Sequence, residues 1–380
     1  NPRIRSLDPT PSPMYAFTSS FAAPATSLSS TSRICPRAVP VAPRAPVARR
    51  AAAPAPAVTA QAAQAAAPVV GEGNGGLERV TLTHEASQQE VEIYSYGAAV
   101  VSWKVRNDPI FFISSVAKWD KTKAIRAGIP ICWPQFGPYG IDPQPTIPNN
   151  IPFHIPLPAP HASNFWRFAP VHPTGDLGVH GFARDSQWTI RSTETLEDGS
   201  SAAVFGLTSD DAPWGDYKYD AEYTVTLSNS GLETAFKVKN TGDKPFKFTM
   251  SFHNYFQVSG VENVRIYGLE SLKVTDRMQN DKEGVEEDTG GVGKIVEKET
   301  DSIYADAPEE LAIFDISSMR IVKIKKTPSL SDATLWNPFG SEGADPGWKN
   351  FVCVEPAVIK NPVEVAPGEE WLGAQLLGTE

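Results

Sequence analysis

Four short clusters of the chain place an ionisable side chain beside glycine, proline or an aromatic residue, as functional loops on a β-scaffold often do. They cover residues 125–137, 179–184, 251–256 and 352–356. Arg126 lies in the first cluster among apolar neighbours, where a planar guanidinium suits bidentate contact with a phosphate. The second cluster adds the imidazole of His180 and the cation of Arg184, and the other two contribute His253 and Glu355.

Each of these residues also has an ordinary structural interpretation. A single arginine is usually a solvated or salt-bridged surface group. His253, between Phe252 and Tyr255, fits a half-buried histidine bonded to backbone, and alternation along an apolar strand would turn Glu355 to solvent. No single residue therefore decides between structure and function.

The elements that must position these residues are predicted to be β-strands. Apolar residues alternate with a period of two in residues 91–96, 221–227 and 233–239, which indicates half-buried strands. Turn sequences at 229–231 and 240–243 separate the later runs from each other and from 246–250, which predicts an antiparallel meander. No stretch has a helical period with proper caps. The fold class predicted is all-β, a large antiparallel β-sandwich over residues 77–380.

Residues 141–176 do not fit this pattern, because nine prolines interrupt them. We interpret them as a Pro-rich surface insertion, with a retained non-coding stretch of the gene as the alternative. His154, His161 and His172 lie seven and eleven residues apart without adjacent acids or cysteines, which is weak spacing for a metal. We expect solvated histidines and no metal site.

The composition of the chain limits the kinds of partner that the protein can bind. The 380 residues carry a formal charge of -10, which argues against nucleic-acid binding, and no run approaches the roughly 20 apolar residues of a membrane span. The cysteines at 35, 132 and 353 form neither a metal motif nor a disulfide framework. We expect a soluble monomer that needs no cofactor and binds a small molecule.

Residues 1–76 differ in composition from the rest. They hold seven arginines, no lysine and only two acids, which leaves 27 basic and 42 acidic residues and a formal charge of -15 in the remaining domain. A segment rich in Ala, Pro, Ser and Arg is typical of an organelle transit peptide followed by a disordered linker. Met14 is a plausible start. We expect import into a plastid, the chloroplast stroma, with mitochondrial import or an unaddressed linker as alternatives.

Taken together and in this order, the motifs resemble the aldose 1-epimerase family, in its hexose-6-phosphate mutarotase branch. The resemblance runs from about residue 77 to 377. The shared strings are Tyr96-Gly-Ala, Ser102-Trp-Lys, Arg126-Ala-Gly-Ile-Pro, Pro134-Gln-Phe-Gly, His180-Gly-Phe-Ala-Arg, Phe252-His-Asn-Tyr-Phe, Thr300-Asp-Ser-Ile-Tyr, Trp336-Asn-Pro and Val354-Glu-Pro. The resemblance implies a galactose mutarotase-like supersandwich.

The resemblance also implies roles. His253 corresponds to the general acid that protonates the ring oxygen, and Glu355 to the base that takes the proton of the anomeric hydroxyl. Opening a hemiacetal needs one acid and one base at the same carbon and no cofactor. We expect Glu355 to be ionised and His253 protonated near working pH. The implied substrate-binding residues are Arg126, Gln135, His180, Arg184, Asp301 and Trp336.

Arg126 and Arg184 match the residues that this branch offers to the 6-phosphate. Two arginines left unpaired by an unphosphorylated sugar would be unfavourable, so hexose 6-phosphates, glucose 6-phosphate first, are the expected substrates. We expect these arginines to create a local positive basin. The alternatives are a catalytically silent sugar-phosphate-binding regulatory protein and an epimerase of free galactose. A glycosidase would need two acting carboxylates.

Overall fold

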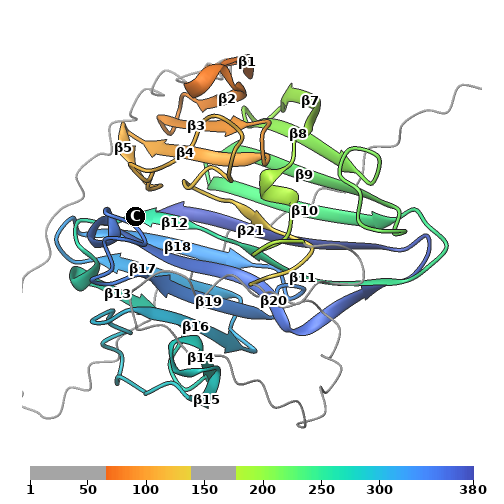
Figure 1. Ribbon diagram of the computed structural model, residues 1–380. Helices are drawn as coiled ribbons and strands as arrows, with labels where there is room; N and C mark the ends of the chain where they lie inside the picture. Colours follow the sequence, from red (N-terminus) through yellow and green to blue (C-terminus); the bar gives the residue numbers. More distant parts are fainter. Residues whose placement is uncertain (1–65, 138–176) are drawn as a thin grey trace, which may run out of the picture. The chain divides into compact units, whose positions relative to one another are not determined.

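The structure is a computed structural model that describes residues 66–137 and 177–380, and it contains three antiparallel sheets (Figure 1). The first sheet has the order β1-β2-β3-β4-β5. Its strands are β1 (Val69–Glu72), β2 (Glu78–His84), β3 (Gln89–Tyr94), β4 (Ala99–Val105) and β5 (Asp108–Pro109). Within the described residues, no helix has the length and apolar composition needed to span a membrane.

The second sheet has eight strands in the order β13-β17-β18-β21-β10-β9-β8-β7. They are β13 (Val264–Tyr267), β17 (Glu310–Asp315), β18 (Arg320–Lys326), β21 (Glu370–Thr379), β10 (Gly231–Asn240), β9 (Tyr219–Ser228), β8 (Ser201–Thr208) and β7 (Thr189–Thr195). Burial alternates strictly along β9, so one face of this sheet lies in the core.

The third sheet runs β15-β14-β16-β19-β20-β11-β6, with β12 also paired to β20. Its strands are β15 (Lys282–Val285), β14 (Lys273–Asp276), β16 (Thr300–Ala305), β19 (Asp332–Asn337), β20 (Phe351–Val365), β11 (Phe246–Phe252), β6 (Ile131–Cys132) and β12 (Tyr255–Gln257). In the part of the chain that the structure describes, five single turns of 3-10 helix lie between strands: η1 (Asn74–Gly76), η2 (Ala183–Asp185), η3 (Val261–Asn263), η4 (Arg277–Gln279) and η5 (Trp348–Asn350).

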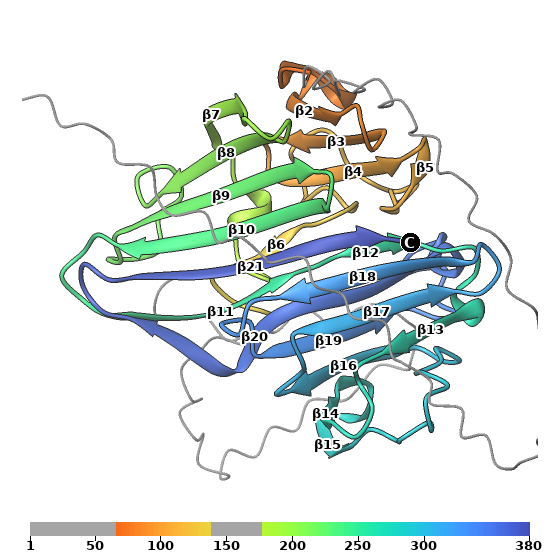
Figure 2. The same ribbon diagram turned by 180° about the vertical axis from the view of Figure 1, so that it is seen from behind.

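The second and third sheets stack on each other, with β18 and β17 over β20 and β19 in both views (Figures 1 and 2). Large aromatic side chains fill the core between the sheets. Trp133 alone makes edge or tilted contacts with five rings, which belong to Phe182, Trp214, Tyr219, Phe236 and Phe248. The all-β antiparallel sandwich predicted from the alternating runs is confirmed.

Two details differ from the sequence-based expectation. The runs 221–227 and 233–239 form the hairpin β9–β10, but the next run, β11, crosses to the third sheet and does not continue the meander. A sandwich needs such crossings, since both layers must bury their apolar faces against each other. The folded part also begins before residue 77, because β1 pairs with β2. Most of residues 1–76 and all of 141–176, including the three histidines, lie outside the described residues.

Candidate active site

His253 and Glu355 lie opposite each other on two neighbouring segments of the third sheet. From Met250 onward, β11 and then β12 pair with β20 in the same register, and His253 lies in the gap between β11 and β12. The flanking pairs are Ser251 with Ala357 and Tyr255 with Cys353. Counting inward from either pair puts His253 opposite Glu355, where cross-strand side chains are close neighbours. Pro356 has no N–H for the ladder here, and the His253 N–H donates to the carbonyl of Pro130.

The pair lies on the face of the third sheet that is turned away from the second sheet. Asn254, the residue after His253, points the opposite way and bonds Gln375 of β21 across the core. Successive side chains of a strand alternate between faces. His253 is 7% exposed and Glu355 is 1% exposed, so both side chains are withdrawn from bulk water.

The two side chains are in contact. His253 Nδ1 lies 3.1 Å from Glu355 Oε1. The geometry of this contact is not that of a hydrogen bond, and neither atom has a hydrogen-bond partner within the described ranges. Glu355 Oε2 accepts a hydrogen bond from Ser251 Oγ at 2.7 Å. One oxygen of the carboxylate is therefore anchored, while the other faces the imidazole.

Burial sets the protonation of the pair. It raises the pKa of Glu355 to about 8, against the opposing effect of the Ser251 hydrogen bond. It lowers the pKa of His253 to about 3, and the charges of Arg184 and Arg126 lower that pKa further. Near neutral pH the pair thus holds one proton, on Glu355. This is the reverse of the arrangement expected from the sequence, because desolvation penalises both charged forms.

Three rings hold the imidazole of His253. Tyr255 stacks on it at 4.7 Å with an interplanar angle of 4°. Trp336 of β19 meets it edge-on at 5.7 Å, and His180 does so at 5.6 Å. Packing on several sides restricts the ring to one orientation, which a proton-transferring group requires.

A cavity of about 790 Å³ opens over the pair. Seven of the eight residues predicted from the sequence line it: Arg126, His180, Arg184, His253, Asp301, Trp336 and Glu355. They come from segments between residues 126 and 355, so the fold brings together groups that are far apart in the chain. Convergent polar groups in one concave, partly aromatic cavity are typical of a small-molecule site.

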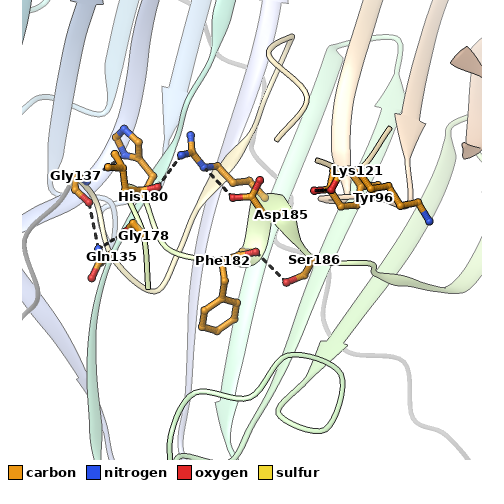
Figure 3. A network of polar contacts seen from close by, with 12 residues as sticks. Tyr96, Lys121, Gln135, Gly137, Gly178, His180, Phe182, Asp185 and Ser186 are labelled. Carbon is orange, nitrogen blue, oxygen red and sulfur yellow. Dashed lines mark hydrogen bonds and ion pairs between the residues drawn. The ribbon is translucent and has the colours of Figure 1, made fainter. Parts of the chain in front are cut away.

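Gln135 is the exception, because it is buried behind the cavity wall. Its Nε2 donates to the carbonyl of Gly178 at 2.6 Å and to that of Gly137 at 3.3 Å (Figure 3). Its role in the structure is to hold together the two chain segments that carry His180. The glutamine lies in a conspicuous motif, but the sequence did not reveal which way it points.

His180 occupies a strained turn. Its φ is +66°, its N–H donates to the Gly137 carbonyl at 2.9 Å, and its Nδ1 accepts from the Gly137 N–H at 3.1 Å. The next residue, Gly181, has φ +70°, and a Cβ there would lie 2.2 Å from the carbonyl oxygen of Trp133. Burial holds the pKa of His180 well below its usual value, so the imidazole is neutral. A neutral ring with one nitrogen bonded to backbone can present the other to a sugar hydroxyl.

The arginines of the cavity each lie near an acid. Arg126 Nε is 3.5 Å from Asp345 Oδ2, and its guanidinium lies over the ring of Trp336. Arg184 Nε is 3.8 Å from Asp185, and its Nη2 donates to the Val179 carbonyl. Each of these two arginines therefore has an acid close by, and the positive charge of both still acts in the cavity, where it lowers the pKa of His253.

Sequence analysis missed several residues of the cavity. Arg277 of η4 lies 3.4 Å from Asp301 Oδ1 and over the ring of Phe136. Lys118, Lys121 and Lys123 also line the cavity. Three lysines within six residues, just before the Arg126 motif, were the available signal. Nothing in the sequence pointed to Arg277.

A family model described as aldose 1-epimerase matches residues 167–377. A relative from Cenchrus ciliaris, named "putative glucose-6-phosphate 1-epimerase", is 31% identical, and the match covers 78% of this chain and 83% of the relative. The chain belongs to the aldose 1-epimerase family. It is accordingly an epimerase that acts on sugars, and the residues of the cavity are candidates for that chemistry.

Solved structures support the fold of this family member. A mutarotase candidate from Salmonella typhimurium superposes with a TM-score of 0.64 at 22% identity, covering 82% of this chain and 93% of that one. A galactose mutarotase-like protein from Clostridium acetobutylicum gives 0.61 at 15% identity, covering 83% and 99%. The expectation of a galactose mutarotase-like fold is confirmed.

Proposed function

We propose that this epimerase interconverts the α and β anomers of hexose 6-phosphates, glucose 6-phosphate first, by acid–base ring opening and reclosure. The observation that carries the proposal is the contact of His253 with Glu355 at the base of a cavity lined by six cationic side chains. These are Lys118, Lys121, Lys123, Arg126, Arg184 and Arg277. The name of the Cenchrus relative supports the same substrate.

The reaction needs one proton on the pair. In ring opening, one group gives a proton to the ring oxygen while the other takes the proton of the hydroxyl on C1. In this scheme the proton first shifts from Glu355 to His253 across their 3.1 Å contact. His253 then gives it to the ring oxygen while Glu355 takes the proton of the hydroxyl on C1, so after ring opening the pair again holds one proton, on Glu355. Rotation about the C1–C2 bond then turns the aldehyde, and reclosure reverses the transfers on the other face.

Burial favours the proton on Glu355, which is the arrangement that this scheme assigns to the open-chain aldehyde. Stabilising that arrangement opposes collapse back to the starting anomer before rotation. His180 and Asp301, on the same wall, are proposed to bond sugar hydroxyls. Burial raises the pKa of Asp301 and Arg277 opposes the rise, so the ion pair helps to keep this carboxylate an acceptor.

The test measures magnetisation transfer between the anomeric protons of glucose 6-phosphate by NMR, with the full chain. Glu355→Gln preserves shape and should lower the exchange rate about 10²–10⁴-fold, as general acid–base groups do. His253→Gln should do the same. Glu283→Gln, an exposed carboxylate of β15, is the matched control and should retain full activity.

Two outcomes would replace the proposal. Binding of glucose 6-phosphate without faster exchange would favour the silent regulatory protein. Equal acceleration of glucose, galactose and glucose 6-phosphate would mean that the cationic groups do not select for phosphate. Import into a plastid and a monomeric state remain proposals that rest on composition.

A further inference from the structure

Cys353 is a buried thiol beside the His253–Glu355 pair, and the proposed mechanism does not use it. It lies two residues before Glu355 on β20, so its side chain leaves the strand on the same face. Its strand partners are Tyr255 of β12 and Trp336 of β19, whose rings pack around His253. Cys353 is 0% exposed and forms no disulfide. The thiol, the imidazole and the carboxylate therefore meet at one place in the third sheet.

The three side chains have the spacing of a set of metal ligands. His253, Cys353 and Glu355 each offer one ligand atom, and these three atoms all lie within 4.8 Å of one another. His253 Nδ1 and Glu355 Oε1 are 3.1 Å apart. Tetrahedral zinc with bonds of about 2.0–2.3 Å separates its ligand atoms by roughly 3.3–3.6 Å. Small changes of the side-chain torsions thus bring the three atoms to the spacing that a metal ion needs.

A second observation points to a ligand at the same atoms. His253 Nδ1 and Glu355 Oε1 are both buried, and neither has a hydrogen-bond partner within residues 66–137 and 177–380. Buried polar atoms are nearly always bonded, so two unpartnered atoms that face each other require a physical reason. A cation between them would take a lone pair from each and satisfy both atoms at once.

The ligand types select the class of metal. Thiolate and imidazole suit Zn²⁺ and related transition-metal ions, whereas Mg²⁺ and Ca²⁺ bind oxygen ligands. A thiolate and a carboxylate together neutralise a dication, so the occupied site has no net charge to bury. The positive charges of Arg184 and Arg126 reach His253 and oppose a cation there. The two anionic ligands offset this repulsion.

We propose that His253, Cys353 and Glu355 bind Zn²⁺ or a similar transition-metal ion, and that the bound ion inhibits the enzyme. His253 and Glu355 line the cavity, which gives the ion its route from solvent, and Cys353 holds it from the buried side. Binding releases the proton of the thiol and the proton of the pair to solvent. The metal then occupies the lone pairs that proton transfer needs. The site itself does not depend on the proposed function, whereas its inhibitory effect does.

The first test is the absorption spectrum of the full chain with Co²⁺, which substitutes for Zn²⁺ as a coloured probe. A bond between cobalt and a thiolate gives a charge-transfer band in the near ultraviolet, and this band reports coordination independently of catalysis. Native protein should show the band, and Zn²⁺ should displace the cobalt. Cys132→Ala is the matched control and should keep the band, because Cys132 is also a buried free thiol but is not one of the three ligands. Cys353→Ala should lose it.

The second test is anomeric exchange of glucose 6-phosphate in the presence of Zn²⁺. Native protein and Cys132→Ala should lose activity as Zn²⁺ is added, recover it with a chelator and show no response to Mg²⁺. Cys353→Ala should keep the basal rate. Its Zn²⁺ concentration for half-inhibition should be at least about tenfold higher, since even the loss of a group that only supports a ligand costs about 10–100-fold in metal affinity.

Cys353→Ser is the second variant, because it nearly keeps the volume of the side chain and removes only the sulfur; it should also lose the cobalt band. A native protein without the band would overturn the proposal. So would a band that persists in both Cys353 variants, which would place the thiolate elsewhere in the chain, or Zn²⁺ inhibition that is equally strong in them. A native protein that shows the band but does not accelerate anomeric exchange would refute the proposed function and leave the metal site in place.

Discussion

Removing the hydroxyl of Ser251 tests whether the protonation of Glu355 limits catalysis. Ser251 Oγ donates to Glu355 Oε2 at 2.7 Å, and both side chains are buried. A hydrogen bond to a carboxylate stabilises the ionised form and lowers the pKa. Ser251→Ala removes that effect without adding bulk, so the pKa of Glu355 should rise above about 8.

The size of the shift follows from the energy of the bond. Hydrogen bonds to charged groups contribute about 1.5–3 kcal/mol, and one pKa unit corresponds to about 1.4 kcal/mol. The expected rise is therefore about 1–2 units. Above its pKa Glu355 loses the last proton of the pair, and kcat/KM falls about tenfold per pH unit. In the variant the fall should begin about 1–2 pH units higher than in the native protein.

The assay measures kcat/KM for anomeric exchange of glucose 6-phosphate between pH 6 and 10. The decline of kcat/KM at alkaline pH, its alkaline limb, reports the pKa of the essential group in the free enzyme. Ser259→Ala is the control, because Ser259 Oγ bonds Asp315 in the same way but lies outside the cavity. It should change stability and leave the limb in place. A limb that stays fixed in Ser251→Ala, or moves to lower pH, would show that Glu355 does not set it.

Three further outcomes are expected. Arg277→Met should lower kcat/KM about tenfold or more, because Asp301 loses the charge that opposes the rise of its pKa caused by burial. Arg265→Met, which removes bonds to backbone carbonyls only, should leave kcat/KM unchanged. Gly181→Ala should destabilise the protein in urea by about 3 kcal/mol or more, because its Cβ would meet the Trp133 carbonyl, while Gly178→Ala, with open space and a similar φ, should lose about 1–2 kcal/mol. Residues 1–76 fused to a fluorescent reporter should accumulate in plastids, and mitochondrial fluorescence would contradict that address.

The fold class was predictable because it is indicated by a local pattern, the alternation of apolar and polar residues along single strands. Alternation in 221–227 and 233–239 reports directly which face of a strand is buried, and the turn residues between them mark the hairpin β9–β10. The exit of β11 to the other layer was not predictable, since the turn at 240–243 looks the same whether the next strand pairs with β10 or crosses the core. That choice depends on aromatic packing around Trp133, which involves residues far apart in the chain.

The candidate site was predictable only through its motifs. His253 and Glu355 stand out as types, yet their contact depends on a register between β12 and β20 that no short sequence reveals. The protonation of the pair was predicted in reverse, because burial on both sides of β20 is a tertiary property. Gln135 was predicted to bind substrate because it lies in a matching motif. Its amide instead donates a hydrogen bond to the backbone carbonyl of Gly178.

The formal charge of the domain is -15, so the anion proposed as substrate needs positive charge gathered at the cavity. A guanidinium beside a carboxylate has a fixed position and contributes little net field at a distance, so the paired arginines supply shape and hydrogen-bond donors. Lys118, Lys121 and Lys123 line the same cavity and are exposed, so they can attract an anion before it enters, while Asp120 of the same loop offsets part of their charge. If both tasks fell to buried arginines alone, strong attraction would require uncompensated charge beside His253, whose pKa Arg126 and Arg184 already depress. The lysines are not among the charges that lower the pKa of His253, so they attract an anion without disturbing the proton transfer proposed for that residue.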